Sequence, residues 1–247
     1  MRIGCVPYLN AAPLVYGIEH QTVFEIPSLL ADQFAAGRFD VALIPLFEAL
    51  RFPDAVVVDG LSISCFGGVF SVILASRCPV EEIKEVVIDP ASRTSVHLLR
   101  LLLSEHFGIA PEFVSSSSDP LAARLIIGDP AMEFQESRAP GWRILDLGKA
   151  WLDWTGLPFV FAVWTVRNAL PNVRQTASAL REIARQGLAA RSGIAVRQPD
   201  PAAAFQYLTQ NIRYGLGPEE KLAISRFREL LVAGGFLSST SSRLVFV

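Results

Sequence analysis

The amino-acid sequence predicts an α/β fold with two lobes, two strands that cross between them, and a C-terminal helical segment on the first lobe. Strand and helix patterns alternate through two successive stretches, which a Phe-Gly-Gly break at residues 66–68 separates. Such alternation is typical of a mainly parallel sheet. Residues 69–76 and 159–166 are the candidate crossing strands, outward and back, and after residue 170 only helix patterns follow.

The first stretch predicts three strands and two helices. Residues 40–46 form a continuously apolar run, which is the pattern of a strand buried on both faces. Shorter strands are expected at residues 2–6 and 24–27. One helix is expected after Pro13, and a second is expected to start with Ser28 as its cap and to end at Gly37.

The second stretch repeats the pattern before a helical tail. Strands are expected at residues 85–90, 111–114, 124–127 and 143–148, and helices at 96–107, after Asp119-Pro120 and after residue 128. The tail has helix patterns at residues 173–191, after Asp200-Pro201, and from Pro218 to Gly234. We therefore expect one lobe to comprise residues 1–76 and 165–247, and the other to comprise residues 77–164.

Composition excludes several classes of protein. Among 247 residues, 51% are hydrophobic and 19% are charged, so a sizeable core is expected and a disordered chain is excluded. The net charge of −2 gives no strong field to attract nucleic acid or an anionic membrane. The longest apolar runs, at residues 69–75 and 157–166, fall short of the ~20 residues that span a bilayer. No secretory signal pattern is visible, so a cytoplasmic location is expected.

Known cofactor and metal motifs are missing from the sequence. The three cysteines and three histidines have no metal-ligand spacing. No glycine-rich dinucleotide or phosphate loop follows a strand, and no GxSxG elbow occurs. Dinucleotide, P-loop and α/β-hydrolase chemistry therefore have no support in the sequence.

At residues 6–13, 88–95 and 126–132, a predicted strand ends and is followed by polar residues and then by a predicted helix. In open α/β sheets, ligands bind beyond the carboxyl ends of strands, and helix N-termini favour anions. Residues 92–95 form the best anion candidate, because they offer hydroxyls, a guanidinium and helix N–H groups. The glycine-containing segment 62–71 adds two further serine donors. The competing interpretation is that these polar residues only cap helices, and that Arg93 faces solvent or pairs with an acid. Segment 62–71 would then be a β-bulge in a hinge strand.

Six segments, taken together and in order, resemble the chorismate dehydratase family of menaquinone biosynthesis, which acts in the futalosine route. They are RIGCVPYLNAAPLVYGI (2–18), DVALIPLFEAL (40–50), SIS…GGVFSVIL (62–74), IDPASRTSVHLLRLLL (88–103), ARLIIGDPAM (123–132) and DLGKAWLDWTGLPFVFAVW (146–164). The helical tail is similar to the family only in pattern.

The resemblance implies a type II periplasmic-binding-protein-like fold and the conversion of chorismate to 3-[(1-carboxyvinyl)oxy]benzoate and water, without a cofactor. It implies Asn10 as the key catalytic side chain. Candidates for binding the two substrate carboxylates are Ser64, Ser71, Thr94 and Ser95, with Arg93 and Asp129 as further binding residues. Asp129 could also be a base or a helix cap. Because asparagine is not basic, we hypothesise that the enolpyruvyl carboxylate of the substrate itself takes the proton.

Other functions stay open at this point. A small-anion binding protein of the same fold, cytosolic or exported, would bind without catalysis. A cyclase of the same pathway has a His-Glu pair where this chain has Gly128-Asp129, which counts against that interpretation. A regulator would need a DNA-binding region, for which the chain leaves no room. The expected partner is a small dicarboxylate, and the lobes are expected to close on it about hinges near residues 75 and 163.

Overall fold

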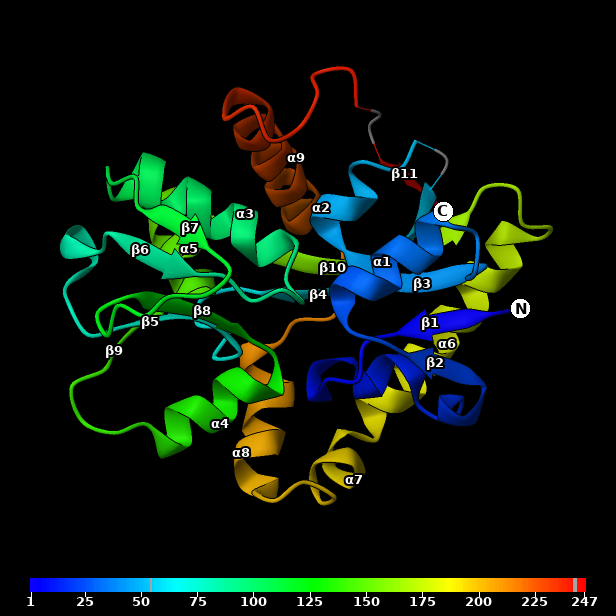
Figure 1. The fold of residues 1–247 in the computed structure, drawn as a ribbon. Helices are drawn as coiled ribbons and strands as arrows, with labels where there is room; N and C mark the ends of the chain where they lie inside the picture. Colours follow the sequence, from blue (N-terminus) through cyan, green and yellow to red (C-terminus); the bar gives the residue numbers. More distant parts are fainter. Residues whose placement is uncertain (54, 242–243) are drawn as a thin grey trace.

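Two β-sheets, one in each lobe, form the framework of the protein (Figure 1). The computed structural model describes residues 1–53, 55–241 and 244–247. Within these residues the first sheet has the strand order β11-β4-β10-β3-β1-β2 and the second has the order β7-β6-β8-β5-β9. The strands of the first sheet are β1 (Ile3–Cys5), β2 (Thr22–Phe24), β3 (Val41–Pro45), β4 (Ala55–Cys65), β10 (Phe159–Arg167) and β11 (Val245–Phe246). Those of the second are β5 (Val72–Ser76), β6 (Glu85–Val87), β7 (Glu112–Val114), β8 (Ala123–Ile127) and β9 (Arg143–Asp146).

The pairing directions follow from the order of elements. Strand β1 pairs in parallel with β2 and β3, and β6 pairs in parallel with β7 and β8. Helical segments connect β1 to β2, β2 to β3 and β6 to β7, as parallel pairing requires, whereas a loop with a turn leads from β7 to β8. Strand β10 returns antiparallel between β3 and β4, and β5 lies antiparallel between β8 and β9. Every residue of β3 is buried, as its continuous apolar run predicted. The predicted two-lobed α/β fold is therefore confirmed.

One of the expected crossing segments has a different structure. Residues 69–76 do not form one strand, because Phe70 has a φ of 66° and residues 72–76 belong to the second sheet as β5. The outward connection between the lobes is the segment 66–71, which follows β4. The return connection leads into β10, and β10 pairs with β4 in the first sheet. The chain enters the second sheet at Val72 and returns to the first sheet at Phe159. Both positions come earlier in the chain than the lobe limits expected at residues 76 and 165.

Several helix boundaries also differ from those expected. The helix expected after Pro13 is a 3₁₀ segment, η1 (Leu9–Val15), which contains that proline. Helix α1 (Pro27–Ala35) begins one residue before Ser28, with Pro27 in its first turn, where a proline loses no hydrogen bond. The Asp119-Pro120 pair starts no helix, because the Asp119 carboxylate accepts a hydrogen bond from Leu121 N in a turn (2.9 Å) before β8.

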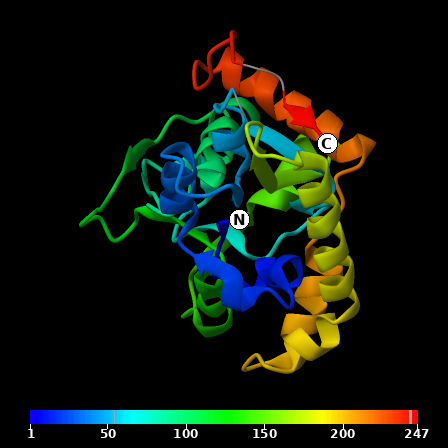
Figure 2. The same ribbon diagram turned by 90° about the vertical axis from the view of Figure 1, so that its right-hand side faces the viewer.

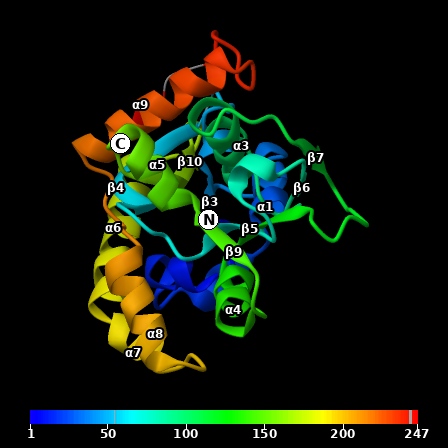
Figure 3. The same cartoon turned by 90° about the vertical axis from the view of Figure 1, so that its left-hand side faces the viewer.

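The remaining helical segments cover the two sheets. They are η2 (Glu19–Gln21), α2 (Leu46–Ala49), η3 (Val80–Glu82), α3 (Thr94–Leu101), η4 (Leu102–His106), α4 (Asp129–Ser137) and α5 (Leu147–Thr155). The C-terminal tail comprises α6 (Val173–Ala189), α7 (Arg191–Ala195), α8 (Pro201–Gln206), η5 (Tyr207–Asn211) and α9 (Pro218–Ala233). Helix α9 lies at the opposite end of the molecule from α7 and α8 (Figures 1 and 3).

The tail packs on the first lobe as predicted, chiefly through α6. Ala177, Leu180 and Ala184 are buried on one face of α6, which runs beside the N-terminal segment (Figure 2). Gly187 allows the closest approach to η1, because a Cβ at this position would lie 2.0 Å from the Pro13 carbonyl oxygen. The tail therefore supports η1, the segment that carries Asn10. None of the helices in the described ranges has the length and apolar character to cross a membrane.

Candidate active site between the lobes

A cavity lies between the two lobes and contains about 580 Å³ of space free of protein atoms, including the part that opens to solvent. Small-molecule sites are often found at such an interface between two lobes. Its polar lining residues are Tyr8, Asn10, Ser71, Ser92, Arg93, Thr94 and Ser95. Apolar walls come from both lobes and include Leu43, Ile63, Val72, Ile127 and Phe161. The cavity can therefore hold a largely apolar ring that carries polar groups.

Three helices direct their N-termini toward this cavity. Pro27 begins α1, Thr94 and Ser95 begin α3, and Gly128 precedes α4, and all four residues line the cavity. The first N–H groups of a helix have no partner inside the helix, and they carry the positive end of its dipole. Pro27 and Pro130 have no N–H and Ser28 N is bonded to Ala91 O, so the N-terminus of α3 is the best place for an anion.

The segment before α3 supplies most of the polar side chains. The Thr94 hydroxyl oxygen accepts a hydrogen bond from Phe47 N of the other lobe (3.1 Å), which leaves its own proton free to donate. The Ser92 hydroxyl is buried and has no hydrogen-bond partner among the described residues. Arg93 lies 3.3 Å from Asp32 in an ion pair that is exposed to solvent and therefore weak. Its Nε also lies 3.9 Å from the carboxylate of the buried Glu48, so two acidic side chains hold the guanidinium beside the cavity.

Asn10 lies in the cavity where the sequence motif placed it. It is held on η1, directly after β1 and Tyr8. Its side-chain oxygen is buried and has no partner within the described part of the chain. An unsatisfied buried acceptor costs about 1–3 kcal/mol, so a ligand that donates a hydrogen bond here would be favoured.

Ser71 is fixed by contacts from the second lobe. Its carbonyl oxygen accepts a hydrogen bond from Gly128 N (2.7 Å). The preceding residue, Phe70, has a left-handed backbone that is unfavourable for its type. The Asp146 carboxylate accepts from Phe70 N (2.7 Å), and Gln135 donates to Phe70 O (2.6 Å), so these bonds hold the strained turn.

The Ser71 hydroxyl contacts a residue that sequence reasoning missed. Tyr207 of η5 donates a hydrogen bond from its hydroxyl to Ser71 Oγ (2.7 Å), and both residues are buried. Burial raises the pKa of the Tyr207 phenol, although the neighbouring Ser71 and Asn10 side chains act in the opposite direction. The only sequence signal for Tyr207 was its place in an apolar helical pattern, which does not separate a core residue from a site residue.

Two of the predicted binding residues lie outside this cavity. The Ser64 side chain is on the face of β4 opposite to Ile63, because successive strand residues point to opposite faces. Its hydroxyl donates to the Arg213 carbonyl oxygen (3.1 Å). Asp129 is neither the cap of α4 nor a cavity residue, because Gly128 is the cap and the carboxylate accepts from Leu9 N of the first lobe (3.1 and 3.3 Å). Burial raises the pKa of Asp129.

Other contacts join the lobes around the cavity, so the structure is closed. Ser28 N donates to Ala91 O (3.1 Å) on the side of α1. On the side of α4, the Tyr8 ring lies against Gly128, where a Cβ would be 2.9 Å from the ring. Burial, followed by the charges of Asp89 and Asp129, raises the pKa of Tyr8 to about 12.

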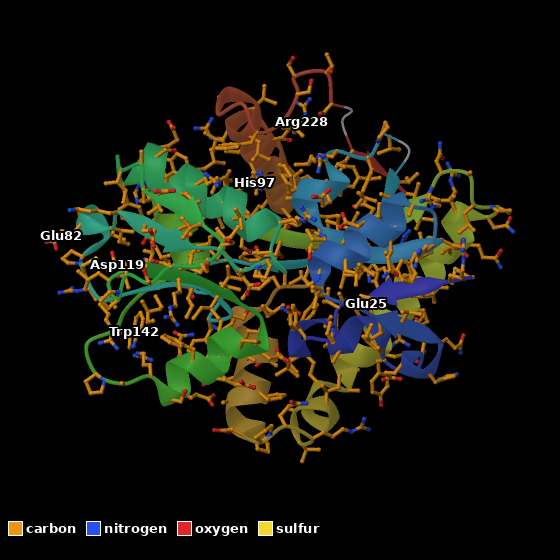
Figure 4. All side chains as sticks on the ribbon, viewed as in Figure 1. Glu25, Glu82, His97, Asp119, Trp142 and Arg228 are labelled. Atoms are coloured by element: carbon orange, nitrogen blue, oxygen red, sulfur yellow. The ribbon has the colours of Figure 1, made fainter. Side chains whose placement is uncertain are left out.

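The histidine nearest the site lies behind it. His97 of α3 stacks on Phe47 with ring centroids 3.6 Å apart and donates from Nδ1 to the Arg93 carbonyl oxygen (2.8 Å). Burial lowers the pKa of His97, which is not among the residues that line the cavity. Its label in Figure 4 lies beside α9. Within the described ranges, no group of three or more His, Cys, Asp or Glu side chains could hold a metal ion.

Comparison with known proteins agrees with this architecture. AF1704 from Archaeoglobus fulgidus superimposes with a TM-score of 0.75 at 16% identity, over 96% of this chain and 98% of that one. The periplasmic aliphatic sulphonate binding protein SsuA from Escherichia coli superimposes with a TM-score of 0.64 at 14% identity, over 98% of this chain and 94% of that one. These likenesses show a periplasmic-binding-protein-like fold.

The sequence comparisons are more specific. A chorismate dehydratase of Thermus thermophilus is 28% identical over 93% of this chain and 94% of its own length. The profile of a family described as menaquinone biosynthesis matches residues 1–233, and the chain therefore belongs to the menaquinone-biosynthesis family.

Proposed function

We propose that this protein is a chorismate dehydratase, which converts chorismate to 3-[(1-carboxyvinyl)oxy]benzoate and water. Family membership and the similarity to a chorismate dehydratase support the proposal. The observation that carries it in the structure is the unpartnered Asn10 oxygen in the same cavity as the N-terminus of α3. The Asn10 oxygen can accept a hydrogen bond from a substrate hydroxyl, and the N-terminus of α3 can bind a carboxylate.

The reaction needs one proton acceptor and one hydroxyl leaving group. The ring carbon that bears the ether loses its proton, and the neighbouring carbon loses its hydroxyl. The electron pair of the broken C–H bond forms the new double bond, which makes the ring aromatic. The proton and the hydroxide leave as water, so the atoms balance. Negative charge that develops on the ring carbon spreads through the double bonds to the ring carboxylate.

The side chains of the cavity fit the needs of this reaction. Thr94, Ser95 and the N–H groups of α3 can bind one substrate carboxylate, and Ser71 can donate to the other. Donors fixed in a closed site stabilise the charge that develops in the transition state. Asn10 can accept a hydrogen bond from the leaving hydroxyl and so orient it.

The proton acceptor in this proposal is the enolpyruvyl carboxylate of the substrate. Among the residues described as lining the cavity there is no Asp, Glu or His, and Arg93 is the charged member. A guanidinium stays protonated at neutral pH and asparagine is not basic, so neither can remove a ring proton. The substrate supplies a carboxylate within reach of its own ring.

The first test is conversion of chorismate by the purified, chelator-treated protein. We expect the ultraviolet spectrum to change to that of an aromatic ring and the product mass to be lower by one water, at a rate that the chelator does not alter. Chorismate that binds but is recovered intact would favour the alternative, a small-anion binding protein of the same fold. The absence of a cofactor, a cytoplasmic location and a place in the futalosine route stay predictions that rest on the family resemblance.

Closure of the lobes is expected to depend on Asp129. Asp129→Ala removes the acceptor for Leu9 N, and a hydrogen bond to a charged group contributes about 1.5–3 kcal/mol. The variant should therefore need at least about tenfold more ligand to reach the compact form. Small-angle X-ray scattering with increasing 3-(carboxymethoxy)benzoate, a stable aromatic diacid, measures this requirement.

The matched control for this experiment is Asp119→Ala. The Asp119 carboxylate accepts from Leu121 N in a local turn of the second lobe, and its label in Figure 4 lies near the outer edge of that lobe. This variant should close at the same ligand concentration as the wild type. Equal scattering curves for Asp129→Ala and the wild type at every concentration would contradict the role of Asp129 in closure.

A further inference from the structure

Tyr207 reaches the site from the C-terminal tail. It is 2% exposed and begins η5, a segment that also packs against η1. Its hydroxyl lies 2.7 Å from Ser71 Oγ, on the segment that leads into the second lobe. Tyr207 thus joins the part of the chain that follows α6 to a cavity residue of the connection between the lobes.

The direction of the hydrogen bonds matters for what the cavity offers. A phenol has one proton, and Tyr207 gives it to Ser71 Oγ. The Ser71 proton then needs another acceptor, and Ser71 lines the cavity, so a ligand can supply it. Without Tyr207, the Ser71 hydroxyl could rotate and present a lone pair to an anionic ligand instead of a proton.

We infer that Tyr207 is a positioning residue, which sets the Ser71 hydroxyl as a donor to a substrate carboxylate. The inference rests on the proposed function for the identity of the substrate. Tyr207 itself touches no reacting atom. Its effect is to orient the Ser71 hydroxyl so that its proton is available to a carboxylate of the ligand.

Tyr214 provides an internal comparison. It belongs to the same tail, is 5% exposed and has a buried hydroxyl with no hydrogen-bond partner among the described residues. It does not line the cavity. The fold therefore tolerates a buried tyrosine hydroxyl that has no hydrogen-bond partner among the described residues. Burial alone does not explain why Tyr207 is hydrogen-bonded to Ser71.

The test compares Tyr207→Phe with the matched control Tyr214→Phe. Phenylalanine keeps the ring and removes only the hydroxyl. For Tyr207→Phe we expect kcat/KM for chorismate and the calorimetric affinity for 3-(carboxymethoxy)benzoate each to fall by at least about tenfold. Tyr214→Phe should keep both values. Thermal unfolding of both variants shows whether the fold is retained.

A double-mutant cycle separates positioning from packing. If Tyr207 acts through Ser71, Ser71→Ala and the double variant Ser71→Ala/Tyr207→Phe should lose similar affinity for the diacid, because the second change removes a bond that is already gone. Fully additive losses would overturn the inference. If Tyr207→Phe alone strongly lowers the thermal stability, the affinity of Ser71→Ala for the diacid still tests whether the Ser71 hydroxyl binds the ligand.

The outcomes distinguish this inference from the proposed function. If the wild type does not convert chorismate but Tyr207→Phe weakens diacid binding, the proposed function fails and the role of Tyr207 stands. If the wild type converts chorismate and Tyr207→Phe equals it in both measurements, the role of Tyr207 is wrong and the function stands. A wild type that neither converts chorismate nor binds the diacid overturns both.

Discussion

Replacing Asn10 by alanine is expected to lower kcat for chorismate by about a hundredfold, with KM changed much less. Alanine removes the buried oxygen that is available to the leaving hydroxyl and leaves the helix N-termini in place. The substrate should still bind through its carboxylates, but its hydroxyl would no longer be oriented. Steady-state kinetics of the purified variant measure the two constants separately.

Asn10→Asp gives a complementary expectation. Aspartate is nearly the same size as asparagine, but its carboxylate adds a negative charge to a cavity that is proposed to bind two carboxylates. We expect both kcat and affinity to fall, since like charges at short range repel each other in a closed site. Full turnover by either variant would contradict the role of Asn10.

Ser64→Ala is the control for the Asn10 variants. Ser64 is buried and close to the site in sequence, but its hydroxyl donates to Arg213 O outside the cavity. Loss of that bond should cost about 1 kcal/mol of folding stability. Turnover should stay within about twofold of the wild type, because the change leaves the cavity intact.

Gly187→Ala is expected to have the largest effect on stability. A Cβ at this position would lie 2.0 Å from the Pro13 carbonyl oxygen and 2.7 Å from its carbon, which are backbone atoms that cannot rotate away. Helix α6 and η1 must separate to accommodate it. Overpacking of this kind costs about 1–3 kcal/mol or more. Because η1 carries Asn10, turnover should fall together with stability.

Gly193→Ala is the matched control for this prediction. Gly193 lies in α7, and a Cβ there would meet nothing within 4 Å. Alanine is favoured over glycine in a helix by up to about 1 kcal/mol, so stability should be equal or slightly higher. Chemical denaturation of both variants measures the difference. An equal free energy of unfolding for Gly187→Ala and the wild type would contradict the close packing of α6 on η1.

The fold could be predicted largely because apolar runs and helix caps are local signals. Strand β3 followed from its continuous apolar run, and α8 and α9 begin at the predicted Asp200-Pro201 and Pro218. The segment 69–76 could not be predicted in the same way. Its break depends on the left-handed Phe70, which bonds from Asp146 and Gln135 hold in place. Those partners are far away in sequence.

The candidate site was predictable where a motif and a helix N-terminus coincide. Asn10, Ser71, Arg93, Thr94 and Ser95 all line one cavity, although their roles stay predictions. Ser64 was misplaced because its orientation depends on which face of β4 meets the other lobe. Tyr207 was missed because its contact with Ser71 joins residues 136 positions apart.

The central claim is that chorismate binds and reacts in the cavity between the lobes. Its most direct test is a crystal structure of the Asn10→Ala variant soaked with chorismate. We predict the ring between the apolar walls, one carboxylate at the first turn of α3, the other near Ser71, and the hydroxyl toward the space left by the Asn10 side chain. Chorismate bound outside this cavity, or with its carboxylates away from α3 and Ser71, would contradict the account.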